Sequence, residues 1–178
     1  LNLASYQQPV GTMPFEAVAF AVSMPANSFF WKTYRVEVPV EQIAWDLTAT
    51  STSGNLQIAA RRTNVPNAGN NDAFAEAPAG VADGLTLVPP VLSDGVWYVT
   101  VYTDGAAAAG SIRTGPPVVT DIPFIGAVTN DLAAKSGWRI YRFTDINSQL
   151  GVLGWELLLS APVENRLMAL RQNVVPGR

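Results

Sequence analysis

Short runs of alternating apolar and polar positions recur along the chain. In the clearest run, 95–102, every second residue is apolar, which places Trp97, Val99 and Val101 on one face and Tyr98, Thr100 and Tyr102 on the other. Similar runs cover 34–38, 43–50, 56–61 and 84–88, and weaker ones cover 17–23 and 109–114. Thirteen Pro and 14 Gly separate these runs. Short, evenly spaced strands with such breaks predict an all-β sandwich.

The stretch 64–83 lacks this alternation. It is rich in Asn, Ala, Gly and Pro, the residues that favour turns. We expect a long surface connection there, with one short strand around Phe74.

An internal repeat relates the two ends of the chain. Residues 55–66 match 165–176 at a shift of 110 positions, and the same shift places Trp45 on Trp155. Further upstream the shift is 107 to 109, and it matches Trp31, Tyr34, Arg35 and Pro14-Phe15 with Trp138, Tyr141, Arg142 and Pro123-Phe124. Ordered matches of this kind predict a sandwich repeated in tandem, in which Trp45, Trp97 and Trp155 belong to the cores.

The repeat also predicts the domain boundaries. Residues 1–13 would be the last strand and linker of a preceding module, 14–115 a complete sandwich, 116–123 a Pro-rich linker, and 124–178 the first half of a second sandwich. Half a sandwich exposes its core face and its strand edges, so we expect another segment or chain to complete it.

Composition restricts the chemistry. The chain is 48% hydrophobic and only 14% charged, with a net charge of −3 and scattered basic residues, so a nucleic-acid partner is not expected. It has no His and no Cys, which removes Ser-His and Cys-His nucleophile pairs and the usual zinc ligands. No apolar run has the length of a membrane span. We therefore expect neither an enzyme nor a cofactor or metal.

The order of strands with their aromatic residues resembles the bacterial pre-peptidase C-terminal domain, a β-sandwich appended to secreted proteases and other exported proteins. The resemblance is carried by residues 31–39, 43–47, 53–59 and 94–102. It implies an extracellular or cell-surface accessory domain. Gly54-Asn55 stands where that family usually carries acidic residues, so no calcium site is expected.

Five residues are candidates for a binding surface. Tyr98 and Tyr102 share the outward face of one strand and could form a flat aromatic platform. Arg35, Asp46 and Arg61 are expected to point away from the core, and their repeat partners Arg142, Glu156 and Arg171 keep the same charges. Such charges on neighbouring strands predict either a cross-strand pair or triad on the solvent face or a ligand contact.

Other candidates are fewer. Phe29-Phe30 lies near a turn and is a further exposed aromatic pair. Turn chemistry or a solvated position accounts for the carboxylates that could act as acid and base, which are Asp46, Asp72, Asp83, Asp94 and Asp104.

The sequence thus predicts a non-catalytic module that spaces, anchors or presents other domains of a large secreted or cell-surface bacterial protein. Its partners would be neighbouring modules or other copies of itself. Two alternatives stay open. One is a carbohydrate-binding module that docks a polysaccharide on Tyr98 and Tyr102. The other is a filament subunit completed by a strand from a neighbouring chain.

Overall fold

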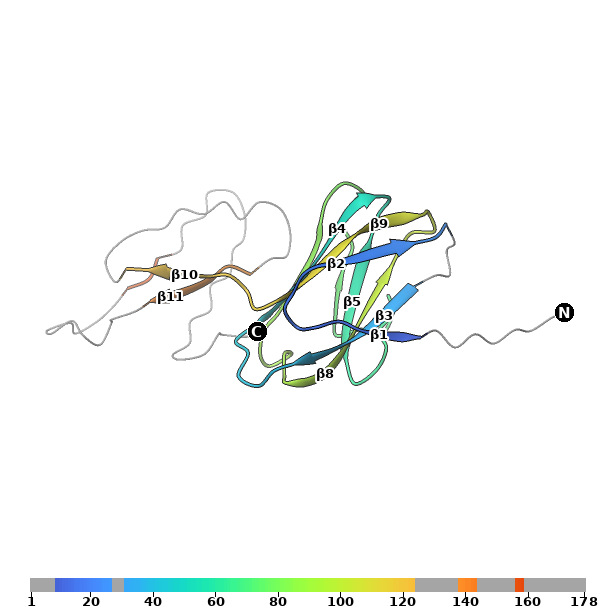
Figure 1. Cartoon of the computed structure of the whole chain (residues 1–178). Coiled ribbons are helices and arrows are strands. Elements are labelled where there is room, and N and C mark those ends of the chain that lie inside the picture. Colours follow the sequence, from blue (N-terminus) through green and yellow to red (C-terminus); the bar gives the residue numbers. More distant parts are fainter. Residues whose placement is uncertain (1–8, 27–30, 124–137, 144–155, 159–178) are drawn as a thin grey trace, which may run out of the picture.

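A computed structural model describes residues 9–26, 31–123, 138–143 and 156–158. The described chain is all-β and contains no helix, so it holds none that could cross a bilayer (Figure 1). Its strands are β1 (Val10–Thr12), β2 (Ala17–Met24), β3 (Trp31–Val38), β4 (Trp45–Ser53), β5 (Gln57–Arg62), β6 (Ala73–Ala75), β7 (Asp83–Leu87), β8 (Gly95–Tyr102), β9 (Ala108–Gly115), β10 (Val119–Ile122) and β11 (Ile140–Phe143).

Two sheets pack face to face and form the predicted sandwich (Figure 1). The first has five strands in the order β1-β3-β8-β5-β6, and the second has four in the order β2-β9-β4-β7. All neighbours in these two sheets run antiparallel except β1, which lies parallel to β3. The chain changes sheet at every step from β1 to β5, so consecutive strands there lie in different layers.

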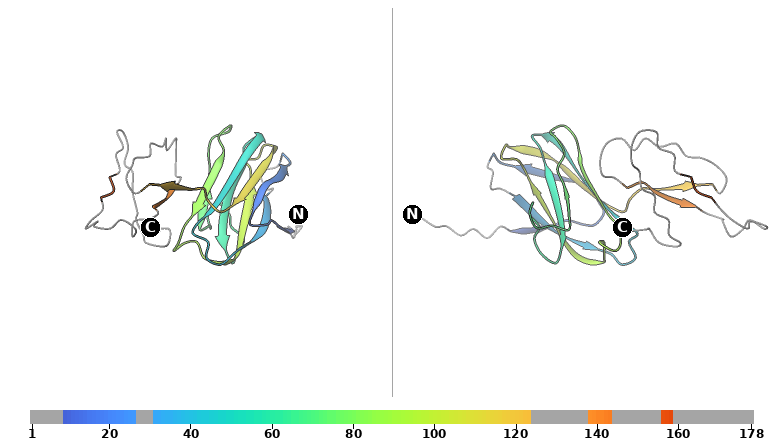
Figure 2. Two further views of the ribbon diagram at one scale, coloured as in Figure 1. Left: turned by 60° about the vertical axis from the view of Figure 1, so that its left-hand side comes forward. Right: turned by 180° about the vertical axis from the view of Figure 1, so that it is seen from behind.

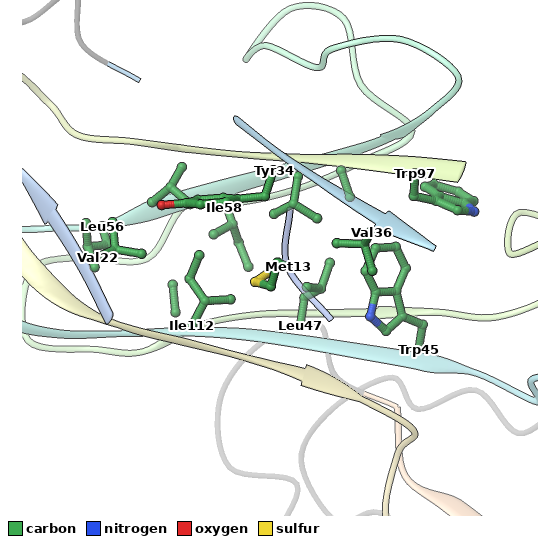
Figure 3. Close-up of a cluster of buried hydrophobic side chains, with 14 of the residues drawn as sticks. Met13, Val22, Tyr34, Val36, Trp45, Leu47, Leu56, Ile58, Trp97 and Ile112 are labelled. Carbon is green, nitrogen blue, oxygen red and sulfur yellow. The ribbon is translucent and has the colours of Figure 1, made fainter. Parts of the chain in front are cut away.

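The inward positions of the alternating runs build the core between the sheets (Figure 3). Trp45 and Trp97 are completely buried and meet edge to face, with ring centroids 5.7 Å apart. The indole N–H of Trp45 donates to Thr114 Oγ1 at 2.5 Å, and that of Trp97 donates to the backbone oxygen of Ser93 at 2.8 Å. The core role predicted for these two tryptophans is confirmed; Trp155 lies outside the described residues.

This core is complete within one stretch of chain. Every member of the cluster lies between Met13 and Ile112, and both sheets lie between Val10 and Gly115. Within the part of the chain that the structure describes, residues 10–115 therefore contain the packing that holds the two layers together, as an independent domain requires.

The structure corrects the predicted start of this sandwich. Val10–Thr12 pairs with β3, and Met13 is buried in the core, so residues 10–13 belong to this sandwich and not to a preceding one. The predicted boundary at residue 14 is too late by one strand. A parallel strand of three residues has too little alternation to be recognised from sequence.

The connection at 64–83 contains the predicted short strand, β6, which pairs with β5 through Phe74 and its neighbours. The turn at Asn67–Asn70 is closed by mutual backbone hydrogen bonds of 3.1 and 3.2 Å. Asp83 differs from the prediction: it opens β7 and is 1% exposed, so it is not a solvated loop residue.

Beyond the sandwich, β10 and β11 form a separate parallel pair, which lies past one end of the two sheets in every view (Figure 2). The segment predicted as a linker, 116–123, thus includes a strand. In this pair Thr120 lies opposite Tyr141 and Asp121 opposite Arg142. In the sandwich Gly11 lies opposite Tyr34 and Thr12 opposite Arg35.

Candidate binding surface

The outer face of the five-stranded sheet gathers four of the five candidate residues. Strand register sets their side chains in rows that cross β3, β8 and β5. One row is Trp31, Tyr102 and Gln57; the next is Thr33, Thr100 and Ala59; the third is Arg35, Tyr98 and Arg61.

The middle row is small and buried although it faces outward. Thr33, Thr100 and Ala59 are all buried, and the hydroxyls of Thr33 and Thr100 are hydrogen bonded at 3.0 Å. Their burial means that the larger side chains of the adjoining rows cover them. At the β6 edge this row continues to a large residue, Phe74, which lies opposite Ala59.

Tyr102 is half-buried in the first row. Its ring stacks on Phe74 from β6, with centroids 5.8 Å apart and planes 13° from parallel. Its hydroxyl is buried and has no hydrogen-bond partner among the described residues. Burial raises the pKa of this phenol, and the charges of Glu76 and Asp83 raise it further. Because Phe74 covers one face of the ring, Tyr102 offers less platform than the strand pattern suggests.

Tyr98 is the more available aromatic. It lies opposite Arg35 on one neighbouring strand and opposite Arg61 on the other. The Nη2 of Arg35 is 3.2 Å from Glu37 Oε2, whereas Arg61 makes no ion pair with any described residue. An aromatic ring between two guanidinium groups can stack on a flat ligand and hold its acidic or hydroxyl groups.

The predicted charge triad does not form. Asp46 lies on β4 in the other sheet, where its Oδ1 accepts a hydrogen bond of 2.6 Å from the hydroxyl of Thr86. Arg35 and Arg61 are separated from each other by β8. Alternation assigned all three residues to outward positions correctly, but it does not say which sheet a strand joins.

Among the repeat partners, Arg142 does form an ion pair. Its Nε and Nη2 donate to the two carboxylate oxygens of Asp121, at 2.7 and 2.9 Å. Glu156 is exposed. Arg171 lies outside the described residues, as does the pair Phe29-Phe30.

Asp83 is a feature that the sequence did not reveal. The backbone N–H of Ala77 donates to its Oδ1 at 2.5 Å, while Oδ2 is buried without a hydrogen-bond partner in the described structure. Desolvation raises the pKa of this carboxyl; the Ala77 hydrogen bond opposes the shift and the charge of Glu76 adds to it. No local pattern marks a buried carboxylate, because its burial depends on β6 and β7 meeting in space.

Close to Asp83 is an open pocket of about 480 Å³, lined by Asn55, Gln57, Glu76, Asp104 and the turn 77–79. The amide of Asn55 donates to the oxygen of Ala77 at 3.1 Å, and that of Gln57 donates to Glu76 at 3.4 Å. Within the described ranges, no three His, Cys, Asp or Glu side chains converge as a metal ion would require. These amides mainly fasten the turn that precedes β7.

Comparison with known proteins identifies the fold but no family. No family model matches the sequence, and no curated protein is similar to it. Among solved structures, the chain is similar to the pre-peptidase C-terminal domain of collagenase from Bacillus anthracis, with a TM-score of 0.50 and 11% identity. That match covers 99% of the collagenase domain and 62% of this chain. The fold is therefore like that of a pre-peptidase C-terminal domain, and the chain is longer than one such domain.

A second structure is PliG of Aeromonas hydrophila, a periplasmic inhibitor of g-type lysozyme, with a TM-score of 0.36 and 13% identity. It covers 61% of this chain and 97% of the inhibitor.

Proposed function

We propose that this chain is a non-catalytic architectural module of a larger secreted or cell-surface bacterial protein, in which tandem sandwiches space and present other domains. The fold supports the coarser part of this proposal, because the similar domain is itself one part of a collagenase. The finer part depends on how the sandwich continues into β10 and β11.

The observation that carries the proposal is the apolar contact between the sandwich and the second strand pair. Ala44 and Val88 lie one position beyond the Trp45–Leu87 pair of the four-stranded sheet. They are buried together with Ile140, and Val119 and Trp138 pack against them. We call this contact the junction. Burial of large apolar side chains contributes on the order of 1.5 to 3 kcal/mol each, which favours a fixed junction over a flexible tether.

The register of β10 and β11 supports a tandem arrangement. Tyr141 and Arg142 are the residues that the repeat aligns with Tyr34 and Arg35, and both pairs lie opposite a parallel strand in matching order. This matching register supports the proposal that the chain after Gly115 begins a second sandwich.

Backbone ¹⁵N relaxation of the full chain tests the rigid arrangement. We expect β10 and β11 to tumble with the sandwich. Ile140→Asp, which places a carboxylate in the junction, should uncouple them. Val118→Asp is the matched control, because Val118 is exposed in the same connection and its substitution should leave the coupling intact. Independent tumbling in the unaltered chain would contradict the proposal. The extracellular assignment is tested by protease treatment of intact native cells, which should degrade the protein.

The row formed by Arg35, Tyr98 and Arg61 favours one other candidate function, the binding of a polysaccharide at Tyr98. Pull-down with insoluble polysaccharides would detect it, and Tyr98→Ala should then abolish retention. Arg113→Ala, which removes an exposed arginine from the other sheet, is the control. Retention unchanged by Tyr98→Ala, or no retention at all, would reject this function.

A further inference from the structure

The first sandwich carries equivalents of three junction residues, with the buried Thr33 in the place of Ile140. In the β10–β11 pair, Val119 lies opposite Ile140, and in the β1–β3 pair Val10 lies opposite Thr33. The sequence repeat places Trp138 on Trp31. Val10 and Trp31 are therefore the equivalents of two residues that pack against Ala44 and Val88.

The equivalent residues differ in exposure. Val119 and Trp138 are partly buried in the junction, whereas Val10 is 46% exposed and Trp31 is 45% exposed. Trp31 is two residues from Thr33 on β3, so it shares the outer face on which Val10 adjoins Thr33. Both side chains are apolar and exposed, and we call the two together the Val10–Trp31 patch.

We propose that the Val10–Trp31 patch is a docking surface for the Ala44–Val88 end of another module of the same kind. The inference rests on the proposed architectural function and names its partner. This partner is chosen because the equivalent residues of β10 and β11, Val119 and Trp138, already pack against an Ala44–Val88 end at the junction. A module then has a patch on one side and a receiving end elsewhere, which is the head-to-tail contact that builds open arrays.

Sedimentation velocity on full-chain variants tests the proposal. In the unaltered chain β10 and β11 cover the Ala44–Val88 end, so this contact should not produce oligomers. Ile140→Asp uncovers that end while the patch stays open, and we expect concentration-dependent head-to-tail oligomers. Adding Val10→Asp or Trp31→Ser to Ile140→Asp should weaken association at least tenfold. The matched control is Val65→Asp added to Ile140→Asp, because Val65 is an exposed valine away from the patch and oligomers should persist.

A second measurement covers the case in which Ile140→Asp misfolds. The fragment 9–115 holds both sheets and the whole main core, and its Ala44–Val88 end is uncovered. Because the fragment also carries the patch, it is prepared with Val10→Asp to prevent its self-association. Titrated into the unaltered full chain, it should bind through the patch of the full chain. Val10→Asp in the full chain or Val88→Asp in the fragment should each lower the affinity at least tenfold.

The proposal is overturned if the folded fragment does not bind the full chain. It is also overturned if the Ile140→Asp chain still forms oligomers when Val10→Asp or Trp31→Ser is added. Binding of a soluble oligosaccharide at Trp31 without any module contact would also overturn it. These failures are distinct from failure of the architectural function, which would appear as independent tumbling of β10 and β11 in the unaltered chain.

Discussion

The β1–β3 and β10–β11 pairs are both parallel and have matching register, but they lie in different surroundings. The β1–β3 pair is one edge of a five-stranded sheet with a complete core beneath it. The β10–β11 pair packs with its apolar residues against the end of that sandwich. The comparison indicates that strand pairs of the same register can be part of a sheet over a core or pack against the end of a sandwich.

The pKa values of two carboxyl groups, one in each region, are shifted in opposite directions. Asp83 in the sandwich is buried, with one oxygen lacking a hydrogen bond, and its pKa is raised by desolvation. Asp121 beside β11 is exposed, and its hydrogen bonds to Arg142 lower its pKa. The sandwich and the strand pair should therefore respond to pH with opposite signs.

The largest effect should come from the core. Trp45→Ala removes a completely buried ring and its hydrogen bond to Thr114, so we expect a loss of about 3 to 5 kcal/mol of stability. Trp138→Ala should instead loosen the junction and leave the sandwich folded. Urea denaturation followed by near-UV circular dichroism separates the two variants. Equal losses of sandwich stability would contradict the distinction between core and joint.

Close packing of β9 against its neighbours gives the next effect. A Cβ at Gly110 would collide with the backbone oxygen of Thr50 and press on Leu56. Gly110→Ala should cost about 1 to 3 kcal/mol in the same denaturation assay, because the neighbouring strand has to move. Gly84→Ala is the control, since an added Cβ there meets only the oxygen of Leu47 at 4.0 Å. Similar stabilities for the two variants would show that β9 can shift freely.

Much of this fold could be predicted because alternation decides which residues face the core. The seven main strands, the burial of Trp45 and Trp97, and the outward positions of Tyr98 and Arg61 all follow from the period of two. Strand order depends on contacts between distant segments. For that reason the predicted charge cluster of Arg35, Asp46 and Arg61 is wrong: Asp46 lies in the other sheet. The burial of Asp83 and the pairing of β1 also depend on contacts between distant segments, so the local pattern does not predict them.

The Asp83 carboxyl should give a smaller, pH-dependent effect. With its pKa raised above the ordinary value of 3.8, the folded state retains a proton that the unfolded chain releases, so stability falls as pH rises from that value through the raised pKa. Asp83→Asn keeps the acceptor for Ala77, should remove this slope, and should raise stability at pH 7 by about 1 kcal/mol. Asp94→Asn, in an exposed turn, should leave the slope unchanged. Lower stability of Asp83→Asn at pH 7 would mean that the carboxylate has a partner.

The Asp121–Arg142 pair should have the smallest effect, because surface ion pairs contribute little. Since the pKa of Asp121 is lowered, its stabilising effect is present above 3.8 and is lost as pH falls through the lowered pKa. Amide chemical shifts around Asp121 in β10 and β11 should therefore change on acidification in an NMR titration, with a midpoint below 3.8. Arg142→Met should raise this midpoint toward 3.8, because the lowered pKa of Asp121 depends on Arg142, and an unchanged midpoint in that variant would contradict the assignment.

The central claim is that the two strand pairs share one register, and the absence of native cysteine allows a direct test by cross-linking. Under mild oxidation, the substitution pairs Thr12→Cys with Arg35→Cys and Asp121→Cys with Arg142→Cys should each form a disulfide. The shifted pairs Gly11→Cys with Arg35→Cys and Thr120→Cys with Arg142→Cys should not, because their side chains lie on opposite faces. Equal cross-linking of the in-register and shifted pairs in β10 and β11, with selective cross-linking in β1 and β3, would contradict the claim.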